Sequence, residues 1–456
     1  MEPQPRSVVE HIERVLALVA PLPARPLAVE DALGSVLAED LYAAVSVPPF
    51  DSAAMDGYAV RLADLPADGR QVTLHVTGDV AAGSSGPAVV GPGRAVRIMT
   101  GAPLPTGADA VVPVEHTSTG RFVAGAPRAE ESVTLARRPT PHVRATGEDV
   151  RQGDLLARAG TEVTAPLVGA LAASGSVTVP VRRRPLVAVV STGSELVPVG
   201  EPLGPGQITD SNGPMLAAAA RAAGADVVRL GPVTDDPAAL RAALNQVVDG
   251  VGSHTGGTGA DLIVTAGGVS AGAADVVREV LASPVGAEGV TDVDVGTVAM
   301  SPGKPQGLAR WRGVPWLALP GNPVGAYASF ELFARRAIDR LQGAGSSGRD
   351  HVSEVCCSAS TSSTQSSTPR AALLSAATGW SGAPGRLLVV PVRLVPLPDT
   401  PPPGDAVPTT RSAVGVVPAG SHHALSALAV ADGLALVPPE VDKVRSGDLV
   451  RVVMLQ

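Results

Sequence analysis

One pattern repeats from Pro185 to Leu341, and it constrains the fold more than any other feature of the sequence. An apolar run gives way to a short polar or Gly/Pro loop, and a helical pattern often follows. The repeats are PLVAVVSTGSEL (185–196), DLIVTAGGVSAGAADVVREVL (261–281), MSPGKPQG (300–307) and LPGNPVGAYASFELF (319–333). Strands that alternate with helices predict an α/β unit with a parallel sheet. Ligands bind such sheets at the carboxyl ends of the strands, so we expect these loops to face one crevice.

The first loop contains two hydroxyl residues, a glycine and an acid. In Ser191-Thr192-Gly193-Ser194-Glu195, backbone N–H groups suit an anion while Glu195 suits a cation. A plain turn after a strand explains the same residues equally well. Further along, Asp235-Asp236-Pro237 opens a helix. We expect Asp236 to cap that helix, with Pro237 as its first residue, and Asp235 to be freer to act.

The second loop is the strongest local signal. Gly267 and Gly268 allow a backbone to approach a ligand closely, and Ser270 offers a hydroxyl. Asp275 falls in the first turn of the next helix, where an acid commonly only stabilises the helix dipole. The loop is not a Walker loop, because the GK[ST] ending is absent.

The last two loops are rich in proline. Lys304 follows Gly303 on a rigid turn, and a lysine held in this way suits a phosphate, although it could also be an ordinary surface lysine. Asn322 caps a long helix that Pro323 opens, and capping could be its whole role.

Residues 46–146 are predicted to form a small β barrel or sandwich. Asp56 lies in PPFDSAAMDGYAVR (48–61) and Thr100 in VRIMTGAPLPTGADAVVPVE (96–115). Each is explained in isolation by ordinary turn chemistry. Asp149, in a Gly-Glu-Asp turn, becomes a candidate ligand for a cation or a polar substrate if it lies near the crevice.

The two ends of the chain contain fewer candidate functional residues. A helix is predicted over residues 7–20, with a capping box from Ser7 and Glu10, and a second short helix over 30–37. Residues 343–370 are rich in Ser, Thr and Gly, which predicts a disordered linker. The chain is β-rich from Ala371, and Ser421 precedes two adjacent histidines. Those histidines lack a third ligand and are expected to be exposed.

Composition narrows the functional class. The net charge of −8 argues against a nucleic acid or an anionic membrane surface as the main partner. The sequence shows no signal-peptide pattern and no apolar stretch that could span a bilayer, so we expect a cytoplasmic protein. Cys356 and Cys357, the only cysteines, are adjacent and give no disulfide framework or metal-ligand spacing. The chain length of 456 residues favours two to four domains.

Taken together, nine stretches resemble the MoeA family of molybdopterin molybdotransferases, whose animal relative is the E domain of gephyrin. They occur in family order: PPFDSAAMDGYAVR, VRIMTGAPLPTGADAVV, ATGEDVRQGD, VAVVSTGSEL, GQITDSNGPML, TDDPAAL, TAGGVSAGAADVV, SPGKPQG and LPGNPV. The resemblance implies a multidomain α/β plus β fold. Its parts would be a split helical/β segment (1–45 and 147–181), an inserted β domain (46–146), a MogA-like α/β molybdopterin-binding domain (182–342), the linker (343–370) and a C-terminal β-barrel (371–456).

The resemblance also implies a reaction. The substrate would be adenylylated molybdopterin, into which molybdate is inserted to give molybdenum cofactor and AMP, with Mg²⁺ present. The protein would be a homodimer with active sites shared between subunits, and a molybdopterin adenylyltransferase would supply the substrate. Two alternatives remain. A related adenylyltransferase would lack the inserted β domain, and a scaffold of the same fold would have lost the chemistry.

Carried over residue by residue, the resemblance assigns roles. Catalytic residues would be Asp56, Thr100, Asp149, Glu195, Asp235 and Asp275, with Asp275 and Glu195 holding the metal. Substrate and phosphate groups would contact Ser191, Thr192, Gly193, Gly267, Gly268, Ser270, Gly303, Lys304, Asn322 and Ser421.

The sequence also departs from the family pattern. Ala53 stands where the family usually has Ser, and Ser301 where many members have Lys. Arg393 is the residue nearest to the arginine that the family carries in a strand of its C-terminal domain.

Overall fold

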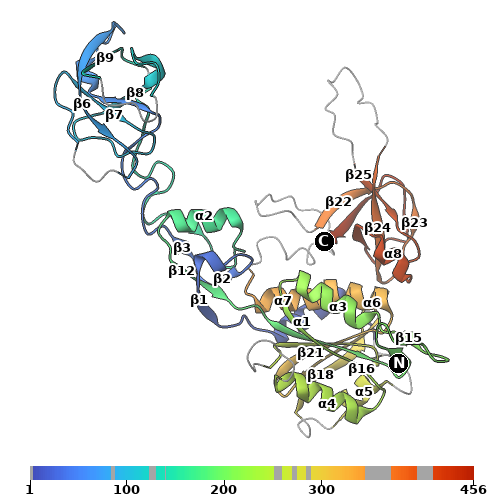
Figure 1. Ribbon diagram of the computed structural model, residues 1–456. Coiled ribbons are helices and arrows are strands. Elements are labelled where there is room, and N and C mark those ends of the chain that lie inside the picture. The colour runs from blue at the N-terminus through green and yellow to red at the C-terminus, as the bar shows by residue number, and fades with distance from the viewer. Residues whose placement is uncertain are drawn as a thin grey trace.

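The computed structural model describes residues 4–83, 88–122, 130–138, 140–250, 259–269, 275–283, 289–344, 371–397 and 414–455. Figure 1 shows an elongated molecule with a β-rich unit at one end, joined through a small middle unit to the α/β unit. A C-terminal β unit lies beside the α/β unit (Figure 1). Of the predicted linker, residues 345–370 lie outside the described residues, and so do Cys356 and Cys357.

The α/β unit is built on a six-stranded sheet in the order β16-β13-β17-β21-β20-β18. The strands are β13 (Leu186–Thr192), β16 (Asp226–Val233), β17 (Leu262–Ala266), β18 (Val290–Thr297), β20 (Pro305–Trp311) and β21 (Val314–Leu319). β16, β13, β17 and β21 run parallel, which confirms the predicted parallel-rich sheet. β20 and β18 are antiparallel to their neighbours. Only Arg312 and Gly313 connect β20 to β21, and so short a connection requires antiparallel strands.

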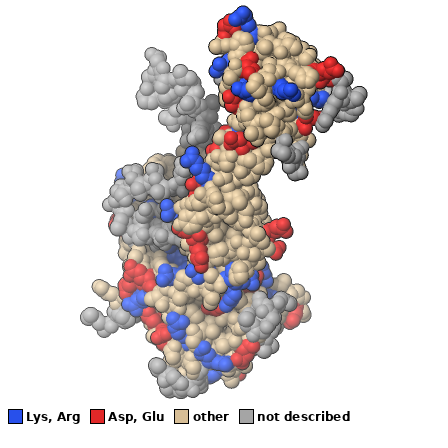
Figure 2. Space-filling model, turned by 90° about the vertical axis from the view of Figure 1, so that its left-hand side faces the viewer, with Lys and Arg blue, Asp and Glu red and all other residues tan. Residues whose placement is uncertain are grey.

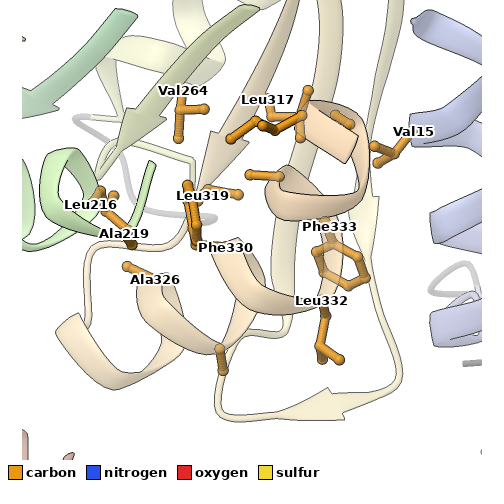
Figure 3. Packing of buried hydrophobic residues seen from close by; sticks show 14 of the residues in the cluster. Val15, Leu216, Ala219, Val264, Leu317, Leu319, Ala326, Phe330, Leu332 and Phe333 are labelled. Atoms are coloured by element: carbon orange, nitrogen blue, oxygen red, sulfur yellow. The ribbon is translucent and has the colours of Figure 1, made fainter. Parts of the chain in front are cut away.

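Helices cover both faces of this sheet (Figure 1). One face carries α1 (Val8–Leu18), α3 (Asn212–Ala222), α6 (Pro323–Ser329) and α7 (Arg335–Leu341), with the π-helical turn η4 (Phe330–Ala334) between the last two. The other face carries α4 (Pro237–Val248) and α5 (Val276–Leu281). Figure 3 shows the first face, where Phe330 and Phe333 are buried with Leu319 and Val264 of the sheet. The two short strands β14 (Leu196–Val197) and β15 (Ile208–Thr209) pair outside the sheet.

The N-terminal helix forms as predicted, but the second one does not. The backbone N–H of Glu10 donates to Ser7 Oγ over 3.1 Å, as the capping box requires. Residues 30–37 form only the 3₁₀ turn η1 (Val29–Asp31) and the strand β2 (Val36–Leu37), so the predicted helix there is wrong. Gly34 lies between them with φ of +73°, a conformation that ends a right-handed helix.

The middle unit joins two distant parts of the chain. β12 (Thr178–Arg182) pairs with β1 (Ala24–Ala28) and with β2, and β11 (Leu155–Ala157) pairs with β3 (Leu41–Tyr42). The helix α2 (Ala165–Ala173) packs on this unit through the buried Leu171. This pairing confirms the predicted split segment. The domain boundaries themselves stay a prediction.

The β-rich unit contains a five-stranded sheet in the order β8-β5-β7-β6-β9. Its strands are β5 (Gly57–Val60), β6 (Val72–Val80), β7 (Arg94–Ile98), β8 (Ala110–Pro113) and β9 (Ser132–Leu135), with the 3₁₀ turns η2 (Leu62–Asp64) and η3 (Val114–His116). Two short strands, β4 (Ser52–Ala53) and β10 (Val143–Arg144), pair beside it. Glycine is required at Gly57, because a Cβ there would lie 2.2 Å from Val112 O.

The C-terminal unit is the predicted β-barrel. β24 (Leu387–Pro396), β25 (Val414–Pro418), β22 (Ala371–Ala376), β28 (Leu449–Met454) and β26 (Gly433–Val437) form a ring that closes through the pairing of β24 with β26. β19 (Met300–Ser301), from the α/β unit, pairs with the outside of β24. The remaining elements are β23 (Trp380–Ser381), β27 (Lys443–Val444) and the helix α8 (Leu425–Ala429).

Candidate active site

Several loops meet at one edge of the α/β sheet. The carboxyl ends of the four parallel strands β16, β13, β17 and β21 all reach this edge. β20 runs in the opposite direction, with Gly307 opposite Ala318 of β21, so its first residues reach the same edge. The loop before β20, which carries Lys304, therefore lies beside the loops that follow the parallel strands. Such an edge is where α/β sheets bind ligands.

The loop after β13 combines buried hydroxyls with an exposed acid. Ser191 Oγ donates to the buried Asp210 Oδ2 over 2.7 Å, so its hydroxyl is already engaged inside the protein. Thr192 Oγ1 is buried, and within the described part of the chain it has no hydrogen-bond partner. A Cβ on Gly193 would lie 2.6 Å from Glu195 Oε2. The Glu195 carboxylate therefore folds back over the glycine backbone.

Asp235 connects two of these loops. Its Oδ2 accepts from Ser194 N over 2.9 Å, and its own N–H donates to Ser194 Oγ over 3.0 Å. Asp236 Oδ1 accepts from Ala238 N over 2.9 Å, as a helix cap does. Asp236 is the cap that the sequence predicts. Asp235, which we expected to be freer to act, does not cap the helix, but its carboxylate holds the loop that carries Glu195.

The glycine loop after β17 approaches the β13 loop closely. Gly267 and Gly268 have φ of +105° and +62°, and a Cβ on Gly267 would lie 2.4 Å from Thr192 O. Only glycine fits this position. Asp275 is the residue just before α5, one position ahead of the predicted first turn, and its side chain does not cap the helix. Ser270 lies outside the described residues.

A buried amide supports the Lys304 loop. Gln306 Nε2 donates to Gly303 O over 2.8 Å and to Ser329 Oγ over 2.7 Å, and Gln306 is only 1% exposed. Gly303 has φ of +112°, and a Cβ there would lie 3.0 Å from Ser329 Oγ. The exposed Lys304, one of two lysines in the whole chain, is thus presented from a fixed turn.

Beside this turn lies a cavity of about 370 Å³ between the α/β unit and the barrel. Its described lining residues are Met300, Ser301, Pro302, Gly303, Lys304, Pro305, Pro320, Gly321, Asn322, Arg386 and His423. Asn322 Oδ1 accepts from Val324 N and Gly325 N, both at 3.1 Å, so this oxygen is used by the cap of α6. Ser421 is not among the described lining residues, although its Oγ accepts from His423 N over 3.4 Å.

A second group of predicted residues lies in and beside the β-rich unit. Asp56 Oδ1 accepts from Thr100 N and Thr100 Oγ1, both at 2.7 Å. These bonds, the backbone one first, lower the pKa of Asp56. Asp51 makes the same pair of bonds with Thr146, at 2.7 and 2.8 Å. Asp149 is exposed, and its backbone N–H donates to Val47 O over 3.1 Å.

The two groups do not meet within one chain. Asp56 directly precedes β5, and Thr100 follows β7, in the unit that Figure 1 places at the far end of the molecule from the α/β sheet. Lys304, Asp275 and Glu195 lie at the sheet edge. A single copy therefore presents a phosphate-type loop cluster and a separate carboxylate cluster.

Two residues that the sequence did not indicate, Asp210 and Arg386, take part at the sheet edge. Asp210 fixes the start of α3, because its Oδ1 accepts from Gly213 N over 2.9 Å. The signal in the sequence is an acid just ahead of the Ser-Asn pair at the start of α3. Arg386 lines the cavity from the barrel, and no local motif marks it. His423, the second of the two adjacent histidines noted in the sequence, lines the same cavity and is exposed, as expected.

Nothing in the described residues forms a ready-made metal centre. No group of three or more His, Cys, Asp or Glu side chains there could hold a metal ion. Across the same residues, no helix combines the length and the apolar composition that crossing a membrane requires.

Comparison with known proteins gives a consistent result. Residues 6–175 match the family model described as "MoeA N-terminal region (domain I and II)", and residues 188–340 match "Probable molybdopterin binding domain". The chain is 39% identical over 454 residues to Molybdopterin molybdenumtransferase 2 of Mycobacterium tuberculosis, covering 98% of this chain and 99% of that protein. It is 37% identical to the Molybdopterin molybdenumtransferase of Bacillus subtilis, covering 68% of this chain and 69% of that protein.

A solved structure agrees with these matches. The crystal structure of a molybdopterin biosynthesis MoeA protein from Pyrococcus horikoshii superposes with a TM-score of 0.74 at 28% identity. The match covers 99% of this chain and 100% of that chain.

Proposed function

The chain belongs to the MoeA family, and from this we propose the reaction that its sheet edge carries out. The protein is a transferase of molybdenum cofactor biosynthesis, a molybdopterin molybdenumtransferase. In the proposed reaction, the two dithiolene sulfurs of adenylylated molybdopterin bind the molybdenum of molybdate, and one molybdate oxygen leaves as water with the two thiol protons. Water cleaves the pyrophosphate, AMP leaves, and the phosphate of molybdopterin stays on the cofactor.

The observation that carries this proposal is the convergence of glycine loops and one lysine at a single sheet edge. Gly267 and Gly268 bring their loop against the β13 loop, because a Cβ at either position would meet Thr192. The pyrophosphate would bind the backbone N–H groups of these adjoining loops. Lys304 supplies a positive charge from a turn that Gln306 fixes. Ser191, by contrast, stays a weak candidate for ligand contact, because its hydroxyl already donates to Asp210.

Two acids at this edge fit a magnesium ion bound together with the substrate. Mg²⁺ is usually held by one or two carboxylates plus substrate phosphates and water, so Glu195 and Asp275 suffice without a third protein ligand. The ion would neutralise charge on the pyrophosphate as it is cleaved. Glu195 and Asp275 would orient it, while Asp235 keeps the Glu195 loop in place.

The carboxylate cluster would complete the site from a second copy of the chain. Asp56 and Thr100 of one subunit would then face the sheet edge of its partner, where they help to seat molybdate and the dithiolene, with Asp149 nearby. The middle unit offers a surface for such a dimer. In α2 most residues are exposed although the helix is apolar, and nearby Val177 is 80% exposed. Figure 2 shows few charged side chains over this middle region.

The remaining expectations follow from the substrate. Adenylylated molybdopterin has to be supplied by an adenylyltransferase acting on molybdopterin, and a protein working in this sequence of reactions would reside in the cytoplasm. Ser421, just outside the cavity, would contact the substrate through the turn that it shares with His423.

One assay tests the proposal. The full-length protein is incubated with adenylylated molybdopterin, Mg²⁺ and molybdate, and AMP is measured. We expect AMP release that requires molybdate and decreases strongly in Asp275→Asn. Undiminished release by that variant would remove Asp275 from the scheme. ATP consumption on unadenylated molybdopterin would instead indicate an adenylyltransferase, and no turnover of either substrate would indicate a scaffold.

A further inference from the structure

One short segment, residues 208–213, contacts the loops on both sides of the glycine loop that follows β17. It runs from β15 into the first turn of α3. In the sheet β17 lies between β13 and β21, so the loops of these two strands flank the glycine loop. A Cβ on Gly267 would lie 2.4 Å from Thr192 O on one side, and a Cβ on Gly321 would lie 3.5 Å from Gly267 Cα on the other. Whatever holds these two neighbours therefore sets the width of the space that the glycine loop occupies.

Asp210 holds the β13 side of the glycine loop. The residue is only 1% exposed, and both carboxylate oxygens are hydrogen-bonded, Oδ2 to Ser191 Oγ over 2.7 Å and Oδ1 to Gly213 N over 2.9 Å. Arg229 Nη1 of β16 lies 3.9 Å from Oδ2. The fit is tight, because a Cβ on Gly213 would lie 2.5 Å from Asp210 Oδ2. A buried carboxylate is costly unless it is hydrogen-bonded, and these bonds fix the end of β13 relative to the start of α3.

The same segment supports the backbone of the loop that carries Glu195. Ile208 N donates to Glu195 O over 2.8 Å, and Asp210 N donates to Val197 O over 2.9 Å. The Glu195 side chain is exposed, so its position depends on the backbone beneath it. A displacement of Asp210 would therefore move the loop of an acid that we propose as a magnesium ligand.

Asn212 holds the β21 side of the glycine loop. Its Nδ2 donates to Gly321 O over 2.7 Å, in the turn that follows β21. Asn212 is 6% exposed, and among the described residues its Oδ1 is buried without a hydrogen-bond partner. Leaving a buried acceptor unpaired costs stability, which an apolar side chain at this position would avoid. The bond to Gly321 therefore explains an asparagine here better than the packing of α3 does.

We propose that Asp210 and Asn212 are positioning residues, which together keep the two neighbours of the glycine loop at a fixed separation. Asp210 fixes the loop that carries Glu195, and Asn212 fixes the turn at Gly321. Because the two residues lie at the start of one helix, this separation cannot change without breaking one of their hydrogen bonds. Neither residue has to touch the substrate. The inference rests on the proposed function, in which Glu195 and the glycine loop act on the pyrophosphate.

The first test separates hydrogen bonding from charge at Asp210 in the full-length protein. Asp210→Ala removes both side-chain bonds. Asp210→Asn keeps them, because its amide oxygen accepts from Gly213 N while its N–H group donates to Ser191 Oγ. We expect Asp210→Ala to lower kcat for molybdate-dependent AMP release about tenfold to 100-fold, since misplaced groups lose alignment with the reacting atoms. The KM for adenylylated molybdopterin should change less than about threefold, because the lost interaction acts in the transition state.

The conservative variant decides the outcome of this test. Asp210→Asn should recover most of the wild-type kcat, because its hydrogen bonds remain although its charge is gone. A wild-type kcat in Asp210→Ala would overturn the positioning role. An equal loss of kcat in both variants would also overturn it, because the charge of Asp210, and not its hydrogen bonds, would then be what the reaction requires.

Asp261 provides a matched control at the opposite edge of the same sheet. Its carboxylate also holds a backbone N–H and a side chain, since it accepts from Leu186 N over 2.8 Å and from both terminal nitrogens of Arg183. We expect Asp261→Ala to lower the Tm at least as much as Asp210→Ala does, while its kcat stays at the wild-type value. A kcat that falls with the Tm in both variants would mean that Asp210 only stabilises the fold.

Hydrogen exchange assigns each residue to its own loop and needs no turnover. In Asp210→Ala we expect faster exchange of the backbone amides of residues 194–197, with residues 320–325 unchanged. In Asn212→Ala we expect the reverse, together with a kcat about tenfold lower, because one side of the glycine loop is then released. Exchange that stays at the wild-type rate in both loops of both variants would overturn the assignment, and so would faster exchange in the wrong loop.

These measurements separate the inference from the proposed function. If the wild type releases no AMP, the reaction is rejected, and hydrogen exchange alone supports or overturns the hold of Asp210 and Asn212 on the two loops. If the wild type releases AMP while Asp210→Ala and Asn212→Ala keep its kcat and KM, the positioning role is rejected and the enzyme is retained.

Discussion

The sheet edge of the α/β unit and the Asp56 cluster of the β-rich unit, formed by Asp56 and Thr100, suit ligands of opposite charge. At the sheet edge, glycines at positive φ bring two loops together, and Lys304 adds a cation from a fixed turn. In the Asp56 cluster, carboxylates are held by threonine through paired bonds of 2.7 Å. One region suits an anionic ester, and the other suits a cation or a proton. The two regions are separate within one chain (Figure 1), and the proposed dimer would bring them together.

The largest effect is expected on the sheet edge. Lys304→Ala should lower molybdate-dependent AMP release by about 100-fold or more, because one preorganised charge on a developing oxyanion has an effect of this size. The chain contains a matched control in its other lysine, Lys443→Ala, which lies on β27 of the barrel unit and should retain activity. Similar losses in both variants would mean that overall charge, and not position, governs the rate.

The next effect concerns the stability of the β-rich unit. Gly57→Ala should destabilise that unit by about 3 kcal/mol, since the added Cβ has to displace backbone in a packed sheet. The structure places this Cβ 2.2 Å from Val112 O. Urea unfolding followed by hydrogen exchange should show the loss in β5 and β8, with the α/β unit unchanged. Gly78→Ala serves as the control, because Gly78 lies in β6 of the same unit and nothing lies within 4 Å of its Cβ.

A smaller effect tests whether the two regions work together. Asp56→Asn should lower AMP release about tenfold, because the amide keeps the shape of the side chain but loses its charge. Mixing this variant with Lys304→Ala should restore about a quarter of the sites if subunits exchange freely in a dimer. If the mixture is no more active than either variant alone, Asp56 and Lys304 act within the same chain. The two regions would then not form a site shared between subunits.

The smallest expected effect is a difference in acid sensitivity between the region around His11 in α1 and the Asp56 cluster. Burial, and then the nearby Arg6, lower the pKa of His11 to about 3, below its ordinary value of 6.5. The neutral form is therefore favoured in the folded state, and stability present above pH 6.5 is lost as the pH falls from 6.5 towards 3. The pKa of Asp56 is lowered from 3.8, so its contribution is lost only in more acidic solution.

Acid should therefore weaken the packing of α1 on the α/β unit before it affects the Asp56 cluster. Between pH 7 and pH 5 we expect a loss on the order of 1 kcal/mol in urea unfolding of the wild type. His11→Leu should show a smaller difference between the two pH values. An unchanged difference in that variant would assign the acid sensitivity to other groups.

Local patterns predicted the parts of this fold that depend on local chemistry. The strands β13, β17 and β21, the cap at Asp236 and the glycine loop at Gly267 follow from residues close together in the sequence. The reversed direction of β20 was not predicted, because its cause is the two-residue turn that follows that strand and joins it to β21. The reciprocal bonds of Asp235 with Ser194 join loops 41 residues apart, and periodicity contains no information about such a pair. Arg386 was not predicted for the same reason, because the loop beside which it lies, at Ser301, is more than eighty positions earlier in the sequence.

The seam between β19 and β24 has a mechanical consequence. β19 is only two residues long, yet it joins the turn that carries Lys304 to the barrel. The seam is reinforced by packing, because Leu387, Val389 and Leu428 of the barrel unit are buried in one hydrophobic cluster with residues of the α/β unit. The gap between Lys304 and Arg386 is therefore set by this shared core, and a rotation of the barrel would have to disturb it.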